Sequence, residues 1–168
     1  MTKAWIEAAR PRTLPASAAP VIAATAYAAH DSLLLWQPAL LCLLFALLAQ
    51  IASNLGNDYF DFKKGTDRPD RTGPQRAVAS GLISPRTMLV ATVIVLAAAC
   101  AVGLGLIYYG GWWLLPIGAC IAIFALAYSA GPYPLSYHGL GVLTVFVFFG
   151  LIPVNLTYYV QAGFFSLP

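Results

Sequence analysis

The sequence predicts an all-α membrane protein, a multi-pass bundle of transmembrane helices that forms a single domain over residues 1–168. Hydrophobic residues make up 60% of the chain and charged residues only 9%, whereas a soluble domain carries about 25% charged residues. The 82 residues after Arg86 contain no Asp, Glu, Lys or Arg. Because no soluble surface can be built from such a segment, we expect the chain to lie in a lipid bilayer.

Five apolar segments are candidates for spanning helices, which need about 20 mostly apolar residues. They cover roughly residues 13–30, 37–57, 86–108, 112–130 and 139–161. The connections between them are short, except for one polar segment after the second. We find no internal repeat and no second domain. The first apolar segment is a spanning helix rather than a signal peptide, because further membrane sequence follows it.

The basic residues predict the orientation of the bundle. Three precede the first helix and the other six lie within 63–86, so the positive-inside rule predicts that both regions are cytoplasmic. Two membrane crossings separate these regions, so the number of helices also places both regions on the same side. Residues 30–36 and 109–111 then face the opposite side. Topology thereby explains the net charge of +3, and we expect no nucleic-acid partner.

The polar segment 57–70 is the most informative, since it holds four of the six acidic residues. If the second helix continues into it, Asn57, Asp58 and Asp61 share one helix face. Mg²⁺ is commonly held by one or two carboxylates, while substrate phosphates and water complete its shell. Basic residues close by would donate charge-assisted hydrogen bonds to phosphate. The spacing fits a metal-bound diphosphate and an ordinary solvated loop equally well.

Several ordered segments carry a family likeness. They are Asn57-Asp58-x-x-Asp61 followed by Asp67, and residues 9–15, 64–71, 73–81 and 139–150. Together these segments resemble the UbiA superfamily, whose members prenylate aromatic rings in membranes, and in particular its menaquinone-pathway branch. They run from the first predicted helix to the fifth. In that branch an acid usually stands where this chain has Val142.

The resemblance implies a fold of nine transmembrane helices around a central cavity, in the bacterial inner membrane. It implies two Asp-rich cytoplasmic loops that bind Mg²⁺ and polyprenyl diphosphate. The expected reaction transfers the polyprenyl group to 1,4-dihydroxy-2-naphthoate and yields demethylmenaquinone. Only the first loop is present, so we expect a C-terminally truncated fragment with about five of the nine helices. The protein partners are unknown.

The resemblance also assigns roles to individual residues. Asp58 and Asp61 are the expected catalytic residues, and with Asp67 they are the expected metal ligands. The expected substrate-binding residues are Asn57, Lys64 and Arg76, and Tyr128 is added because it belongs to a cluster of tyrosines near one end of the bundle. Tyr128 has a competing interpretation, because interfacial tyrosines usually anchor a helix at the lipid headgroups.

Three other functions stay open. A UbiA-type enzyme could use another aromatic acceptor, such as 4-hydroxybenzoate or homogentisate. The chain could also be a non-catalytic membrane fragment, or part of a transporter. A transporter is disfavoured because the carboxylates gather at one end of the bundle, whereas ion-coupled carriers place ionisable groups within their spans.

Overall fold

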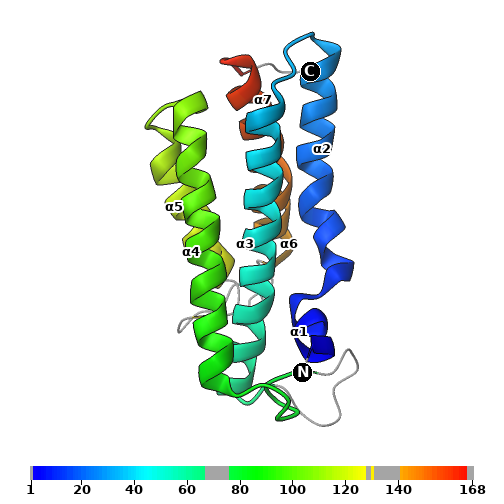
Figure 1. The fold of residues 1–168 in the computed structure, drawn as a ribbon, viewed down its shortest axis with the longest axis vertical. Coiled ribbons are helices and arrows are strands. Elements are labelled where there is room, and N and C mark those ends of the chain that lie inside the picture. Colours follow the sequence, from blue (N-terminus) through cyan, green and yellow to red (C-terminus); the bar gives the residue numbers. More distant parts are fainter. Residues whose placement is uncertain (1, 67–75, 128–129, 131–140, 166–168) are drawn as a thin grey trace.

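The computed structural model describes residues 2–66, 76–127, 130 and 141–165, and every regular element in that part of the chain is a helix (Figure 1). The elements are α1 (Thr2–Ala9), η1 (Pro11–Thr13), α2 (Leu14–His30), α3 (Trp36–Lys63), α4 (Pro85–Gly110), α5 (Leu114–Ala127), α6 (Gly141–Val145), η3 (Phe146–Leu151) and α7 (Ile152–Ala162). The predicted all-α fold is confirmed.

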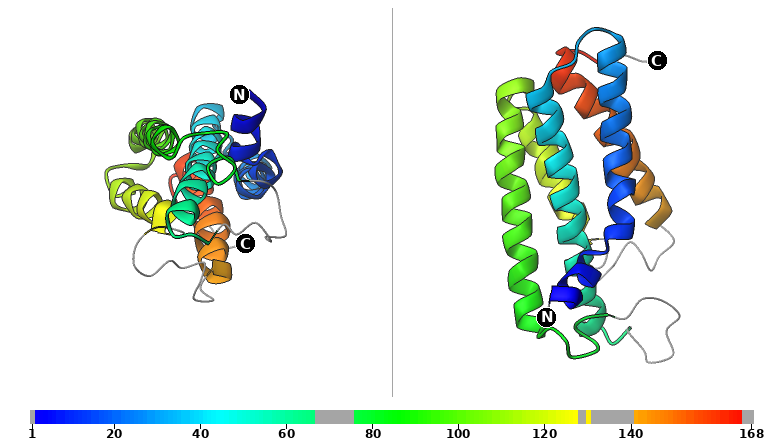
Figure 2. Two further views of the ribbon diagram at one scale, coloured as in Figure 1. Left: turned by 90° about the horizontal axis from the view of Figure 1, so that it is seen from below. Right: turned by 45° about the vertical axis from the view of Figure 1, so that its right-hand side comes forward.

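Helix α3 is the centre of the bundle. It packs against α1, α2, α4, α5 and α7, and the two views in Figure 2 show it between α2 and α4. The long helices run roughly parallel to the long axis of the molecule (Figure 1). Helices α1, α2, α4, α5 and α7 are therefore all positioned by contacts with α3.

The five predicted spans correspond to α2, α3, α4, α5 and the continuous segment α6–η3–α7. Three of these are long and apolar enough to cross a membrane: α3 with 28 residues, α4 with 26 and Gly141–Ala162 with 22. Helix α2 has 17 residues and α5 has 14, fewer than the roughly 20 that a full crossing needs. The six residues of η3 are π-helical.

Helix α3 extends to Lys63, beyond the predicted end at residue 57. It stops in a Schellman motif, in which Gly65 has a φ of +67°. The Gly65 N–H donates to the Phe62 carbonyl, and the Thr66 N–H donates to the Asp61 carbonyl. Glycine adopts the left-handed conformation at this position at little energetic cost, because it has no Cβ. The polar motif is therefore helical, as the shared-face argument required.

A short helix, α1, precedes the first span and was not predicted. Its buried residues Ala4 and Ala8 pack in a cluster with Leu55 of α3 and Met88 of α4. Small side chains on this face allow the helix to lie close to the bundle. The contact brings the N-terminal segment to the same end as the polar motif.

The described parts of the two basic regions lie at the same end of the bundle, where α1, the start of α2, the end of α3 and the start of α4 meet (Figure 1). The opposite end holds Asp31, whose carboxylate accepts a hydrogen bond of 2.6 Å from the Tyr158 hydroxyl. There the Leu35 N–H also donates to Gln161 Oε1. Which side of the membrane each end faces stays a prediction.

Candidate functional site

The candidate site lies in the last turns of α3. Asn57, Asp58 and Asp61 are buried there, with exposed fractions of 8%, 2% and 9%. Burying a charged group is costly unless hydrogen bonds or opposite charges compensate it. The partners of the two carboxylates therefore define the site.

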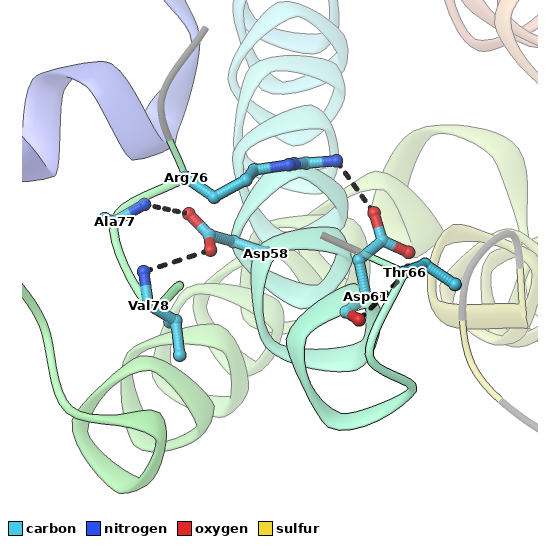
Figure 3. Close-up of polar contacts among 6 residues, drawn as sticks. All are labelled: Asp58, Asp61, Thr66, Arg76, Ala77 and Val78. Atoms are coloured by element: carbon cyan, nitrogen blue, oxygen red, sulfur yellow. Dashed lines mark hydrogen bonds and ion pairs between the residues drawn. The ribbon is translucent and has the colours of Figure 1, made fainter. Parts of the chain in front are cut away.

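Asp58 accepts hydrogen bonds from two successive backbone N–H groups. Its Oδ2 receives the Ala77 N–H at 3.1 Å and its Oδ1 the Val78 N–H at 3.2 Å (Figure 3). The side chains of Ala77 and Val78 are themselves buried in the cluster beneath the site. Asp58 thus attaches the segment before α4 to the end of α3. Sequence reasoning did not foresee this role, because it depends on backbone groups.

Asp61 forms an ion pair with Arg76. Arg76 Nη2 lies 2.7 Å from Asp61 Oδ2, and both side chains are nearly buried (Figure 3). The Asp61 carbonyl accepts the Thr66 hydroxyl at 3.0 Å, so the backbone at this point is held as well. The residues predicted for the metal and for the diphosphate are therefore direct partners, and they are 15 positions apart in sequence.

A second polar network lies one turn earlier on α3. Asn54 Nδ2 donates to the Ala9 carbonyl and to Thr13 Oγ1, both at 2.9 Å, and Gln50 Nε2 donates to Asn54 Oδ1 at 3.2 Å. Gln50 and Asn54 were not among the predicted site residues. Gln50, Asn54 and Asp58 follow one another at intervals of four residues within an apolar helix, and this pattern was the signal that could have identified them.

An apolar cavity of about 270 Å³ lies within the bundle. Helices α2, α3, α4, α5 and α7 all contribute to its lining, which includes Val21, Phe45, Ala49 and Leu156. Ser53 also lines it, and Ser53 precedes Asn57 by one helical turn. A charged cluster and an apolar cavity are therefore adjacent along α3, which suits a ligand with an anionic head and an apolar tail.

Residues 17–168 match the UbiA prenyltransferase family. The chain belongs to this family. It is 44% identical over 158 residues to a 1,4-dihydroxy-2-naphthoate octaprenyltransferase of Mycobacterium tuberculosis, covering 94% of this chain and 54% of the relative. It is 41% identical over 167 residues to the protein of the same description in Escherichia coli, covering 96% and 54%.

The likeness extends to more distant members of the UbiA family. A 1,4-dihydroxy-2-naphthoate octaprenyltransferase of Bacillus subtilis is 32% identical over 157 residues, covering 90% of this chain and 49% of the relative. The chain thus spans about half the length of the curated relatives it matches. No solved structure matches it significantly.

The structure brings together four of the residues that the UbiA motif singled out: Asn57, Asp58, Asp61 and Arg76. Lys64 is the C-cap of α3 and is exposed. Asp67 and Tyr128 lie outside the described residues. Val142, where the branch usually has an acid, is 83% exposed at the start of α6, and nothing in the structure explains the exchange.

The donor set fits Mg²⁺ shared with an anionic substrate. In the described part of the chain, no three His, Cys, Asp or Glu side chains are grouped to hold a metal ion. The carboxylates of Asp58 and Asp61 and the amide of Asn57 are nevertheless the oxygen donors that Mg²⁺ uses, and substrate phosphates and water commonly supply the remainder. These residues alone do not supply enough ligands for a complete Mg²⁺ site.

Proposed function

We propose that the full-length protein carrying this segment transfers a polyprenyl group from polyprenyl diphosphate to 1,4-dihydroxy-2-naphthoate, yielding demethylmenaquinone. The observation that carries the proposal is the buried cluster of Asp58, Asp61 and Arg76 beside an apolar cavity. A diphosphate head and an isoprenoid tail have the matching chemistry. The aromatic acceptor is inferred from the relatives described as 1,4-dihydroxy-2-naphthoate octaprenyltransferases.

The chemical problem is the leaving group. When diphosphate departs from the allylic carbon, the transition state develops a strongly anionic group and an allyl cation. Mg²⁺, when bound, supplies charge neutralisation at the departing oxygens. We propose Asp58, Asp61 and Asp67 as the residues that hold it, with the Asn57 amide beside them.

Arg76 and Lys64 are the proposed diphosphate donors. In the structure Asp61 forms an ion pair with Arg76 through one carboxylate oxygen and one guanidinium nitrogen, so the proposed metal ligand and the proposed phosphate donor lie side by side. With Mg²⁺ bound, Asp61 would be one of its ligands, and the Arg76 guanidinium would donate to a phosphate oxygen. A fixed guanidinium in a site of low dielectric stabilises developing charge without reorganisation.

The apolar cavity has two proposed roles. It accommodates the isoprenoid tail, and it excludes water so that the allyl cation meets the aromatic ring rather than a water molecule. The lining residues Phe45 and Phe148 are aromatic, and aromatic faces attract cations. Tyr128 is proposed to line the substrate path.

The acceptor is tested by assay of the purified full-length enzyme in lipid. With Mg²⁺ and octaprenyl diphosphate, we expect a prenylated product from 1,4-dihydroxy-2-naphthoate, identified by mass spectrometry. Equal or faster product formation from 4-hydroxybenzoate or homogentisate would assign another branch of the family. No Mg²⁺-dependent product from any acceptor would reject the enzymatic function.

We propose that the protein spans the bacterial inner membrane and that the site lies on the cytoplasmic side. In intact cells, a single Cys introduced at position 66 should resist a membrane-impermeant thiol reagent, because the basic regions stay inside. A Cys at position 31 should react. Both positions should react after permeabilisation, which is the control. Labelling at 66 combined with protection at 31 would reverse the orientation.

A further inference from the structure

The continuous segment α6–η3–α7 is interrupted by the π-helical turn of η3. At the end of this turn the Ile152 N–H donates to the Val147 carbonyl, five residues back. Pro153 follows and has no N–H with which to continue an α-helical ladder, and Asn155 Nδ2 donates to the Leu151 carbonyl at 2.8 Å. A π-helical turn inserts an extra residue into a helix, and such turns are frequent at functional sites.

The extra residue changes which side chains before η3 face the interior. Val142 and Val160 are 18 positions apart, about five full turns of an α-helix, so an uninterrupted helix would place them on one face. In the structure Val160 is 3% exposed and lines the cavity, whereas Val142 is 83% exposed. Thr144 would lie about 160° from Val160 in an uninterrupted helix, yet it is 8% exposed and lines the cavity too. The π-helical turn therefore brings Thr144 to the cavity and takes Val142 away from it.

Phe148, within η3, also lines the cavity, and its ring stacks on that of Phe124 in α5. The two ring centroids are 4.2 Å apart and the ring planes differ by 23°, and both residues contribute to the cavity lining. Phe124 precedes Leu126 by two residues, and a Cβ placed on Gly56 of α3 would lie 3.3 Å from Leu126 Cδ2. Gly56 directly precedes Asn57. The stacked pair is therefore at the end of the cavity nearer to the buried carboxylates.

This end of the cavity combines aromatic rings with hydroxyl groups. Thr144 and Ser53 are both buried and both line the cavity. An isoprenoid tail has no polar atom to meet a hydroxyl, and it packs well against aliphatic side chains such as Leu114 and Val160, which also line the cavity. Stacked aromatic rings, in contrast, gain free energy beyond their contact area. The chemistry near Phe148 therefore suits a flat ring that carries hydroxyl groups.

We propose that Phe148 and Thr144, which the π-helical turn brings to the cavity, form the binding site for the aromatic acceptor. The acceptor ring packs against the Phe124–Phe148 pair, and the Thr144 hydroxyl forms a hydrogen bond with a ring hydroxyl. This inference rests on the proposed function and deepens it, because it places the acceptor beside the diphosphate site rather than along the cavity that takes the tail.

Steady-state kinetics of the full-length enzyme in lipid test the inference. Phe148→Leu should raise the KM for the naphthoate about tenfold and leave the KM for octaprenyl diphosphate within about twofold. Phe148→Tyr keeps the ring and should stay within about threefold of the unmodified enzyme in both. The matched control is Phe146→Leu, the same change two positions earlier at a side chain that is 58% exposed, and it should change neither KM.

Thr144→Val removes the hydroxyl at nearly constant shape and should raise the KM for the naphthoate about fivefold, with the KM for octaprenyl diphosphate unchanged. An equal rise of both KM values in Phe148→Leu, or a lower melting temperature with both KM values unchanged, would overturn the proposal. So would a normal naphthoate KM in Phe148→Leu and Thr144→Val together.

Deletion of Gly150 tests the role of the π-helical turn. Removing one residue restores an α-helical turn and rotates the preceding part of the helix by about 100°, so Thr144 leaves the cavity and the naphthoate KM should rise at least as much as in Thr144→Val. Gly150→Ala is the control, because the added Cβ meets only Phe146 Cδ2, at an ordinary 3.9 Å. A normal naphthoate KM after the deletion would contradict the proposal. If the deletion variant fails to fold, the substitutions at Phe148 and Thr144 decide.

A binding measurement separates this inference from the proposed reaction. The probe is 1-hydroxy-2-naphthoate, which lacks one ring hydroxyl, titrated through its own fluorescence without Mg²⁺ or polyprenyl diphosphate. Phe148→Leu should weaken its binding about tenfold, and Phe146→Leu should not. This outcome supports the acceptor site even if no prenyl transfer is detected. Equal affinities of Phe148→Leu and the unmodified protein would overturn it even if the enzyme is active.

Discussion

Replacing Asp61 by Asn in the full-length enzyme should reduce prenyl transfer at least about a hundredfold, equivalent to about 2.7 kcal/mol of transition-state stabilisation. The substitution removes a proposed metal ligand and leaves Arg76 facing a neutral amide. The side chains are nearly the same size, so helix α3 and insertion into the membrane should be retained, with a loss of stability because the nearly buried Arg76 loses its counter-charge. The measurement is the initial rate in saturating Mg²⁺, normalised to the amount of inserted protein.

Asp31→Asn is the matched control for this prediction. It makes the same chemical change at the opposite end of the bundle, where Asp31 accepts a hydrogen bond from Tyr158, and it should retain activity close to that of the unmodified enzyme. Near-normal rates for both Asp61→Asn and Asp58→Asn would refute the metal-site assignment. The two carboxylates would then serve only to hold the segment before α4 against α3.

Residues 1–168 expressed alone should insert into a membrane and yield no prenylated naphthoate. Each helix satisfies its own backbone hydrogen bonds, so insertion does not require further helices. The UbiA family motif implies a second Asp-rich loop facing the first, and the matched relatives are about twice as long as this chain. Without the facing carboxylates the diphosphate is held from one side only. Without the remaining helices, water reaches the allyl cation.

The measurement compares membranes that contain residues 1–168 with empty membranes and with membranes that contain the full-length enzyme. All receive the naphthoate, octaprenyl diphosphate and Mg²⁺. Product above the empty-membrane level, dependent on Mg²⁺, would show that one Asp-rich loop is enough. In that case the mechanism with two facing loops would be wrong.

Composition and hydropathy were sufficient to predict a helical membrane protein, since the segment after Arg86 has no charged residue and can satisfy its backbone only within helices. The ends of the five helices followed within a few residues, except at α3. There the polar composition after residue 57 suggested a loop, although Gly65 was the available signal for the true end. The motif Asn57-Asp58-x-x-Asp61 identified the carboxylates because they are close in sequence.

The partners of those carboxylates could not be predicted in this way. Asp58 binds backbone N–H groups of Ala77 and Val78, and backbone groups leave no mark in a residue pattern. Asn54 binds residues 9–13, which are about 40 positions earlier. Such contacts depend on how α1 and the segment before α4 pack around α3. The periodicity of a sequence indicates which face of a helix is buried. Which segment covers that face is decided only when segments distant in sequence pack together.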